Sequence, residues 1–178
     1  MTFAAAVESA VAKVAPVAGV SIGRRSDRST WLIDFRADAT EMQIAAAMLV
    51  LRDFDILSVA RADAISAIEQ AAAAQHRLSG SVYEGQDARW LSKAEDAARW
   101  RIGDPSATAR LQLEADAVGQ SVGVLVSTIE MQREVMKMRV AQIEAHRRGG
   151  RKAVETTTDE VTLGAVRDAY ISKIEGIS

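Results

Sequence analysis

The chain contains no cysteine in its 178 residues, which excludes disulfide bonds and metal sites built on thiolates. Aromatic residues make up only 4% of the sequence, whereas 48% of it is hydrophobic and much of that share is alanine. Because alanine fills little volume, the helices that it favours must pack closely together or lie against a partner. The composition therefore favours an elongated or oligomeric helical protein over one with a deep globular core.

Neither sign of charge is in large excess. The 24 acidic and 22 basic residues leave a net charge of −2, so there is no global basic excess that would attract nucleic acid. The longest apolar run, residues 44–51, is far shorter than the roughly 20 residues of a membrane-spanning helix. The first residues also lack the basic segment of a signal peptide. We expect a soluble protein, or a part of a soluble assembly, without a nucleic-acid partner.

One short stretch near the start differs from the helix-prone remainder of the chain. The β-branched and aromatic residues in 20–23 and 30–35 predict two short strands joined by a polar connector. Trp31, Ile33 and Phe35 alternate onto one face of the second strand. An isolated two-stranded hairpin is marginal in water. We therefore expect these three side chains to dock the hairpin onto a helix or onto another subunit.

Helices are predicted on both sides of this hairpin, completing an α-β-hairpin-α docking unit over residues 1–55. Apolar residues at helical spacing predict the first helix over residues 2–15. Thr40 suits an N-cap and Gln43 the matching capping-box position of a helix that reaches about Asp53. The side chains expected to face the hairpin are Met42, Ala45, Ala46, Leu49 and Phe54.

The second predicted domain, residues 56–178, is expected to be helical. Helices are predicted over residues 56–78, about 85–102, 105–118 and about 159–175. The sequence SGS at 79–81 predicts a break. Gly103 suits the end of one helix, and Asp104 with Pro105 the start of the next. The expected apolar stripes are Trp90, Leu91, Ala94 and Ala98 in one helix and Val161, Ala165, Val166, Ala169 and Ile174 in the last.

The longest predicted helix covers about residues 121–147 and carries a heptad pattern. Two interpretations remain open: a coiled coil between copies of the chain, with a trimer favoured, or an amphipathic helix packed on its own neighbours. Arg133 and Arg147 interrupt the pattern and would need acidic partners, such as Glu130, Glu134 or Glu144 of a neighbouring chain. The residues predicted to associate are Val122, Val126, Ile129, Met136, Val140 and Ile143.

No catalytic, metal-binding or cofactor-binding residues are predicted, and we do not expect an enzyme. The sequence GQSVG at 119–123 matches the nucleophile-elbow pattern of hydrolases, but a helix is predicted where that motif needs a strand. His146, the base it would require, lies nearly 40 Å further along the same predicted helix, at about 1.5 Å per residue. We interpret Gly119 and Ser121 as helix caps instead. His76 and His146 are the only histidines, and neither has a second ligand at helical spacing.

The densest basic cluster, HRRGGRK at 146–152, allows two interpretations. It suits a helix C-terminus, where cations stabilise the helix dipole and a glycine caps the last turn. It also suits polar contact with an acidic partner through Arg147, Arg148, Arg151 and Lys152. A smaller cluster in the hairpin connector, formed by Arg24, Arg25 and Arg28, is expected to be a solvated loop.

Residues 20–55, VSIGRRSDRSTWLIDFRADATEMQIAAAMLVLRDFD, resemble a segment of small tail-associated proteins of tailed bacteriophages and prophages. The matching positions are Val20 to Gly23, Thr30, Trp31, Ile33, Asp34, Ala39, Thr40, Gln43, Phe54 and Asp55. The second half is similar to another tail-associated segment at Leu111, Glu114, Ala115, Gly119, Ile143, Glu144 and Arg147.

This resemblance implies a structural component of a phage virion tail, located in the fibre, the baseplate periphery or the tail tip. Such a protein is made in the host cytoplasm and binds other phage structural proteins. Two alternatives remain: a tail-fibre assembly chaperone that is not retained in the virion, and a head or neck decoration protein.

Overall fold

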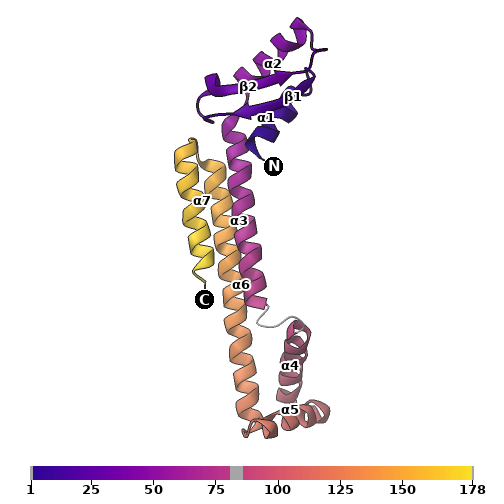
Figure 1. Cartoon of the computed structure of the whole chain (residues 1–178). Coiled ribbons are helices and arrows are strands. Elements are labelled where there is room, and N and C mark those ends of the chain that lie inside the picture. Colours follow the sequence, from indigo (N-terminus) through magenta and orange to yellow (C-terminus); the bar gives the residue numbers. More distant parts are fainter. Residues whose placement is uncertain (1, 81–85, 178) are drawn as a thin grey trace. The chain divides into compact units, whose positions relative to one another are not determined.

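The computed structural model of the chain describes residues 2–80 and 86–177, with side chains described for residues 2–78 and 91–177. Within these residues it forms seven α-helices, a 3-10 turn and one two-stranded sheet (Figure 1). The predicted mainly α fold, with its N-terminal helix–hairpin–helix unit, is confirmed. The elements are α1 (Phe3–Val11), β1 (Val17–Ile22), η1 (Arg28–Thr30), β2 (Trp31–Phe35), α2 (Glu41–Asp53), α3 (Ile56–Gly80), α4 (Gln86–Arg101), α5 (Pro105–Ala117), α6 (Val122–Thr156) and α7 (Glu160–Glu175).

The chain divides into two compact units. The first consists of Met1–Ala67 and Lys152–Arg167, and the second of Ile68–Arg151 and Asp168–Ser178. The docking unit predicted over residues 1–55 therefore lies within the first unit. None of the described helices has the length and hydropathy needed to cross a membrane.

The core of the first unit is built on aromatic contacts. Thr2 caps α1 by accepting a hydrogen bond from the main-chain N–H of Ala5, and the helix then buries its apolar side. The ring of Trp31 meets those of Phe3 and Phe54 edge to face, with centroids 5.4 and 6.0 Å away. Such pairs stabilise a core beyond the area that they bury. The hairpin and its flanking helices therefore bury one another, although α1 ends at Val11, earlier than predicted.

The sheet is a single antiparallel hairpin that lies beside α1 and α2 (Figure 1). Ile22 pairs with Trp31 at the end nearest the connector, and the register shifts by one residue between Val17 and Gly19. Ile33 and Phe35 are partly buried against the same core as Trp31. The prediction that the three share one inward face agrees with this packing.

Helix α2 starts as predicted but turns a different face to the hairpin. Thr40 and Gln43 form the complete capping box. The buried residues are Ala47 and Leu51, with Val50 and Phe54 packed at the margin. The expected inward residues are largely outside: Met42 is 82% exposed, Leu49 is 51% exposed, and Ala45 is also exposed. The prediction was wrong for Met42, Ala45 and Leu49, because this helix carries apolar residues all around and its periodicity does not select one face. It was right for Phe54, which packs against Trp31.

Helix α6, which lies in the second unit as far as Arg151, continues through the two glycines that were predicted to end it. The helix reaches Thr156, and Gly150 is buried inside it. A Cβ atom at Gly150 would lie 3.0 Å from the Cβ of Tyr170 in α7 and 3.1 Å from the Cδ1 of Ile68 in α3. The predicted stop at residue 147 was wrong because close packing of these helices offsets the cost of glycine in a helix, about 1 kcal/mol.

The turn between α4 and α5 has the predicted chemistry. Gly103 adopts a φ of 80°, and Asp104 caps α5 ahead of Pro105. The stripe predicted for α4 was partly wrong, since Leu91 and Ala98 are exposed. The side chain of Trp90 lies outside the described residues, as does residue 81, the last of the predicted SGS break at 79–81. Helix α3 ends at Gly80.

Helix α7 also differs from its predicted stripe. Val161 is almost fully exposed, and Ala165 and Ala169 are exposed as well. The buried residues are Leu163 and Ile174. Alanine and valine at several helical phases leave the apolar direction of this short helix ambiguous in the sequence.

Candidate association surface

The inner side of α6 carries most of the residues predicted to associate. Val122, Val126 and Ile129 are buried in one cluster with Leu111 of α5 and Ala97 of α4. Helices of the same chain therefore cover this part of the predicted seam, in agreement with the interpretation of an amphipathic helix packed on its own neighbours. The remaining predicted residues differ in burial: Ile143 is buried, Met136 half-buried and Val140 exposed.

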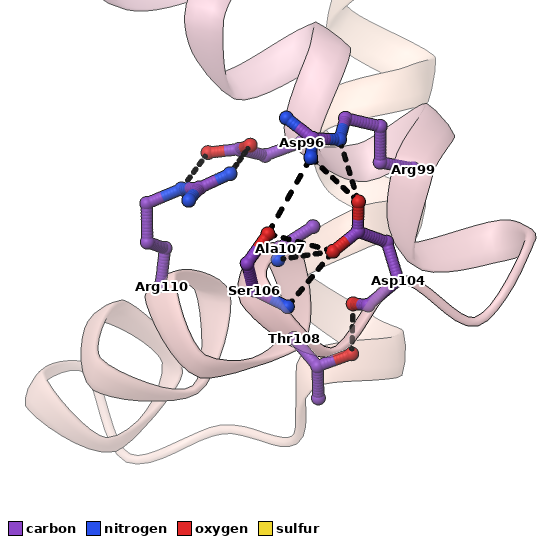
Figure 2. A network of polar contacts seen from close by, with 7 residues as sticks. All are labelled: Asp96, Arg99, Asp104, Ser106, Ala107, Thr108 and Arg110. Carbon is purple, nitrogen blue, oxygen red and sulfur yellow. Dashed lines mark hydrogen bonds and ion pairs between the residues drawn. The ribbon is translucent and has the colours of Figure 1, made fainter.

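A polar network at the corner between α4 and α5 holds α5 in place for this packing (Figure 2). The carboxylate of Asp104 accepts hydrogen bonds from the main-chain N–H groups of Ser106, at 2.8 Å, and Ala107, at 3.3 Å. Arg99 donates a further hydrogen bond of 2.8 Å to the same carboxylate. The Ser106 hydroxyl, the Arg99 guanidinium and the Ala107 N–H together hold the pKa of Asp104 well below its usual value. The cap is therefore charged across the ordinary pH range.

A second pair joins the two helices directly. Arg110 of α5 donates from its Nε to the Oδ2 of Asp96 in α4, over 2.8 Å, and from Nη2 to Oδ1 (Figure 2). The Arg110 guanidinium lowers the pKa of Asp96 although burial opposes this. Two-point contacts of this kind fix orientation as well as distance. Together with the Asp104 network, this pair orients α5 so that Leu111 reaches the inner side of α6.

The opposite side of α6 presents a row of apolar side chains, here called the outer stripe. Its large members are 47–62% exposed. Their spacing alternates between four and three residues. Because each residue turns an α-helix by about 100°, the row lies opposite the buried Val126. The outer stripe consists of Val124, Thr128, Met131, Val135 and Met138.

The N-terminal part of the outer stripe contains a shallow, open hollow of about 480 Å³. The hydroxyls in this hollow are turned toward their own helix: Ser127 donates to the carbonyl of Gly123 at 2.9 Å, and Thr128 to that of Val124 at 3.0 Å. These bonds leave carbon atoms facing outward. The residues lining the hollow are Ser121, Gly123, Val124, Ser127, Thr128 and Met131.

The residues of the hydrolase-like motif have structural roles. Gly119 ends α5 with a φ of 69°, and the hydroxyl of Ser121 accepts a hydrogen bond from the N–H of Val124 at 3.3 Å. Both predicted caps are confirmed. His76 lies 3.0 Å from the carboxylate of Glu144. Among the described residues, no three histidine, aspartate or glutamate side chains are grouped closely enough to hold a metal ion.

The basic cluster at 146–152 lies inside α6, so the interpretation as a helix C-terminus was wrong. Arg147 forms ion pairs with Glu144, at 2.8 Å, and with Glu69 of α3, at 2.7 Å. The Arg147 guanidinium, followed by His76, lowers the pKa of Glu144 to about 2. Arg147 is therefore engaged within its own chain. The exposed Arg148 lies 3.8 Å from the carboxylate of Glu144.

The other members of that cluster and the acids expected to pair across chains also have defined positions. Arg151 and Lys152 are exposed. Glu130 forms an ion pair with Arg101 of α4 at 2.7 Å. Glu134 forms one with Lys137 at 2.6 Å, in which both side chains are more than half exposed. Arg133 is exposed, so it does not interrupt a buried seam.

A comparison of the chain with protein-family models, curated proteins and solved structures found no match in any of the three. The candidate association surface is therefore supported by its geometry alone. The outer stripe was not among the predicted residues, although the sequence carries a signal for it. Its members follow the same heptad spacing as the predicted seam, offset by two residues: Val124, Thr128, Met131, Val135 and Met138.

Proposed function

We propose that this protein is a structural component of a phage virion tail and that it acts through assembly. The observation that carries the proposal is the exposure of large apolar side chains, at helical spacing, in each of the two units. A contiguous apolar surface of this kind marks an interaction site in a soluble protein. The phage setting rests on the resemblance of residues 20–55 to tail-associated proteins.

In the first unit, the exposed apolar surface belongs to α2. Met42, Met48 and Leu49 are each more than half exposed. Met42 and Leu49 lie on the side of the helix away from the buried Ala47 and Leu51, and Met48 lies at the edge between the two sides. This helix belongs to the segment that resembles tail proteins. Its inner side holds the hairpin, and its outer side is free to dock onto a larger particle.

In the second unit, the exposed apolar surface is the outer stripe of α6. The polar corner at Asp104 and the Asp96–Arg110 pair hold α5 in the position from which it covers the inner side of α6, and the outer side stays open. A chain with two such surfaces on separate units can contact two neighbours. That property suits a component of a repeating tail structure.

The direct test is quantitative mass spectrometry of purified phage particles, with immunogold labelling of the chain. We expect a fixed copy number per particle and label on the tail. Absence from purified particles, with presence in tail-assembly intermediates, would favour the assembly chaperone instead. Label on the head or neck would favour the decoration protein.

A matched pair of variants tests the docking surface on α2. Leu49→Glu places a charge on the exposed apolar side and is expected to reduce incorporation into particles, while circular dichroism shows an unchanged fold. Lys13→Glu changes an exposed polar residue of the same unit and is expected to leave incorporation unchanged. Equal incorporation of both variants would argue against docking through α2.

A further inference from the structure

We propose that the outer stripe of α6 is the seam of a parallel, two-stranded coiled coil formed with α6 of a second copy of this chain. The inference deepens the proposed assembly function and rests on it for its biological setting. Its physical basis lies in four features of the second unit: heptad register, residue shape, charge placement and the covering of the same stripe further along the helix.

The heptad register of the outer stripe assigns a residue type to each core position. Thr128 and Val135 fall at a positions, and Met131 and Met138 at d positions. β-Branched residues at a, together with residues at d that are not β-branched, as leucine is not, favour parallel pairs over higher oligomers. The hydroxyl of Thr128 already bonds its own helix, so that residue presents a methyl group to the seam as valine would. The register therefore favours a dimer, in place of the trimer expected from the sequence.

Charged residues flank the seam at complementary positions. Glu134 lies at g and Arg139 at e of the following heptad. In a parallel pair, g of one helix faces e of the next heptad on the other, so the symmetric dimer forms this contact twice. An antiparallel pair brings g against g and loses both contacts. The charge pattern therefore selects the parallel orientation.

These two side chains have unused bonding capacity within the chain. The Nε of Arg139 is enclosed and has no hydrogen-bond partner among the described residues. Glu134 is held by Lys137 in an exposed pair, and exposed pairs of this kind contribute little. Because the Nε itself is enclosed by its own chain, the Glu134 carboxylate of a second copy would pair with the outer nitrogens of the Arg139 guanidinium.

The heptad row of the outer stripe continues along α6 beyond Met138, and another helix covers it near its C-terminal end. Gly149 continues the a positions of Thr128 and Val135, and a Cβ atom there would lie 3.2 Å from the Cε1 of Tyr170 in α7. Helix α7 thus takes the place of a partner beside Gly149, and the outer stripe is the part left open. Because this part is only about 20 Å long at 1.5 Å per residue, we expect dimerisation to depend on protein concentration.

Disulfide trapping tests the seam directly, because the chain has no cysteine of its own. Thr128→Cys and Val135→Cys, each alone, place one thiol at an a position. In a parallel pair in register, both variants are expected to form covalent dimers under mild oxidation. Arg133→Cys, on an exposed position of the same helix away from the outer stripe, is the matched control and is expected to form no covalent dimer.

The trapping experiment has outcomes that overturn the proposal. Dimers from only one of the two seam variants would indicate an antiparallel crossing, which brings at most one such position against itself. If Thr128→Cys and Val135→Cys form no more covalent dimer than Arg133→Cys does, the outer stripe is not a seam. A mass of three chains for the unmodified protein by sedimentation equilibrium would refute the two-stranded pairing.

A charge exchange tests the parallel orientation without new thiols. Glu134→Arg and Arg139→Glu, each alone, place like charges opposite one another and are expected to raise the dissociation constant about tenfold or more, which corresponds to at least 1.4 kcal/mol. The double variant restores opposite charges and is expected to recover most of the affinity. Single variants that dimerise as the unmodified protein does would contradict the predicted contact.

Different results would overturn the proposed seam and the proposed virion role. If neither seam variant cross-links but the chain is present in purified virions at fixed copy number, the seam is wrong and the virion role stands. If the seam variants cross-link but the chain is absent from particles, the dimer stands and the virion role is wrong.

Discussion

The guanidinium group of Arg28 donates a hydrogen bond of 2.7 Å to the main-chain carbonyl of Phe54, and a second one of 2.9 Å to that of Leu51. These carbonyls lie at the C-terminal end of α2, where helical partners are missing. Arg28 comes from the hairpin connector, which was expected to be a solvated loop. That expectation was wrong for this residue, because Arg28 closes the end of the helix that packs on the hairpin.

We expect Arg28→Ala to lower the free energy of unfolding by about 1–2 kcal/mol, because two charge-assisted hydrogen bonds at a helix C-terminus are lost. Arg24→Ala, in the exposed part of the same connector, is the matched control and should change it by less than about 0.5 kcal/mol. Urea denaturation followed by circular dichroism measures both. Equal effects of the two variants would show that the bonds to α2 do not stabilise the first unit.

Two leucines on α5 offer a test of the second unit's core. Leu111 is 2% exposed and lies against α6, whereas Leu113 is 75% exposed on the same helix. Leu111→Ala should lower the free energy of unfolding by about 2–5 kcal/mol, because apolar burial is lost and a cavity is left behind. Leu113→Ala should cost less than about 0.5 kcal/mol. Chemical denaturation compares the pair, and a small effect at Leu111 would contradict the packing of α5 on α6.

Two glycines inside helices should respond in opposite ways to alanine. Gly150→Ala brings a Cβ to 3.0 Å from the ring and Cβ of Tyr170, and overpacking of this kind costs about 1–3 kcal/mol. Gly164 in α7 has nothing within 4 Å of a Cβ, so Gly164→Ala should stabilise by up to about 1 kcal/mol. The melting temperatures of the two variants, measured by thermal unfolding, should shift in opposite directions from that of the unmodified protein. A rise in melting temperature for Gly150→Ala would show that α6, α3 and α7 are more loosely packed there.

The ion pairs of Glu144 predict a pH dependence. Arg147 and His76 lower the pKa of Glu144 to about 2 in the folded chain, from an ordinary value of 4.5. As the pH falls, the unfolded chain therefore takes up this proton first, so the stabilising contribution is present above pH 4.5 and is lost toward pH 2. Glu144→Gln removes that contribution. The stability difference between the unmodified protein and this variant should narrow over that range.

A urea titration at a series of pH values checks this expectation. Glu95→Gln, at an exposed site on α4, is the control. Its free energy of unfolding should differ from that of the unmodified protein by a small amount that is nearly the same at every pH. A difference for Glu144→Gln that does not change between pH 5 and pH 2.5 would show that Glu144 is not held charged by Arg147.

Several local features could be read from neighbouring residues alone. The capping box of Thr40 and Gln43, the start of α5 at Asp104 and the cap at Ser121 were all predicted and are confirmed. Each depends on hydrogen bonds between groups two or three residues apart. The energies of such contacts are encoded in a few consecutive side chains, so the sequence is sufficient to place them.

The buried face of each helix could not be predicted from neighbouring residues. Helix α6 carries two heptad rows, one through Val122 and Val126 and the other through Val124 and Met131, and both have the same period. Which row is buried depends on α5, which is oriented by Asp96 and Arg110 across the corner. Likewise, the glycines near the end of α6 predict a helix stop when only their neighbours in the sequence are considered. Tyr170 and Ile68, which require a glycine at position 150, lie outside that local sequence.

The sequence alone was thus enough to establish that the chain is mainly helical, that a hairpin lies near its start, and where most of its helices begin. The tertiary structure decided which apolar rows are buried and which stay open, including the outer stripe. The physical reason is the range of the interactions. Caps and turns are stabilised by neighbours along the chain, whereas the buried side of an alanine-rich helix is chosen by competition among surfaces distant in sequence, and only packing resolves that competition.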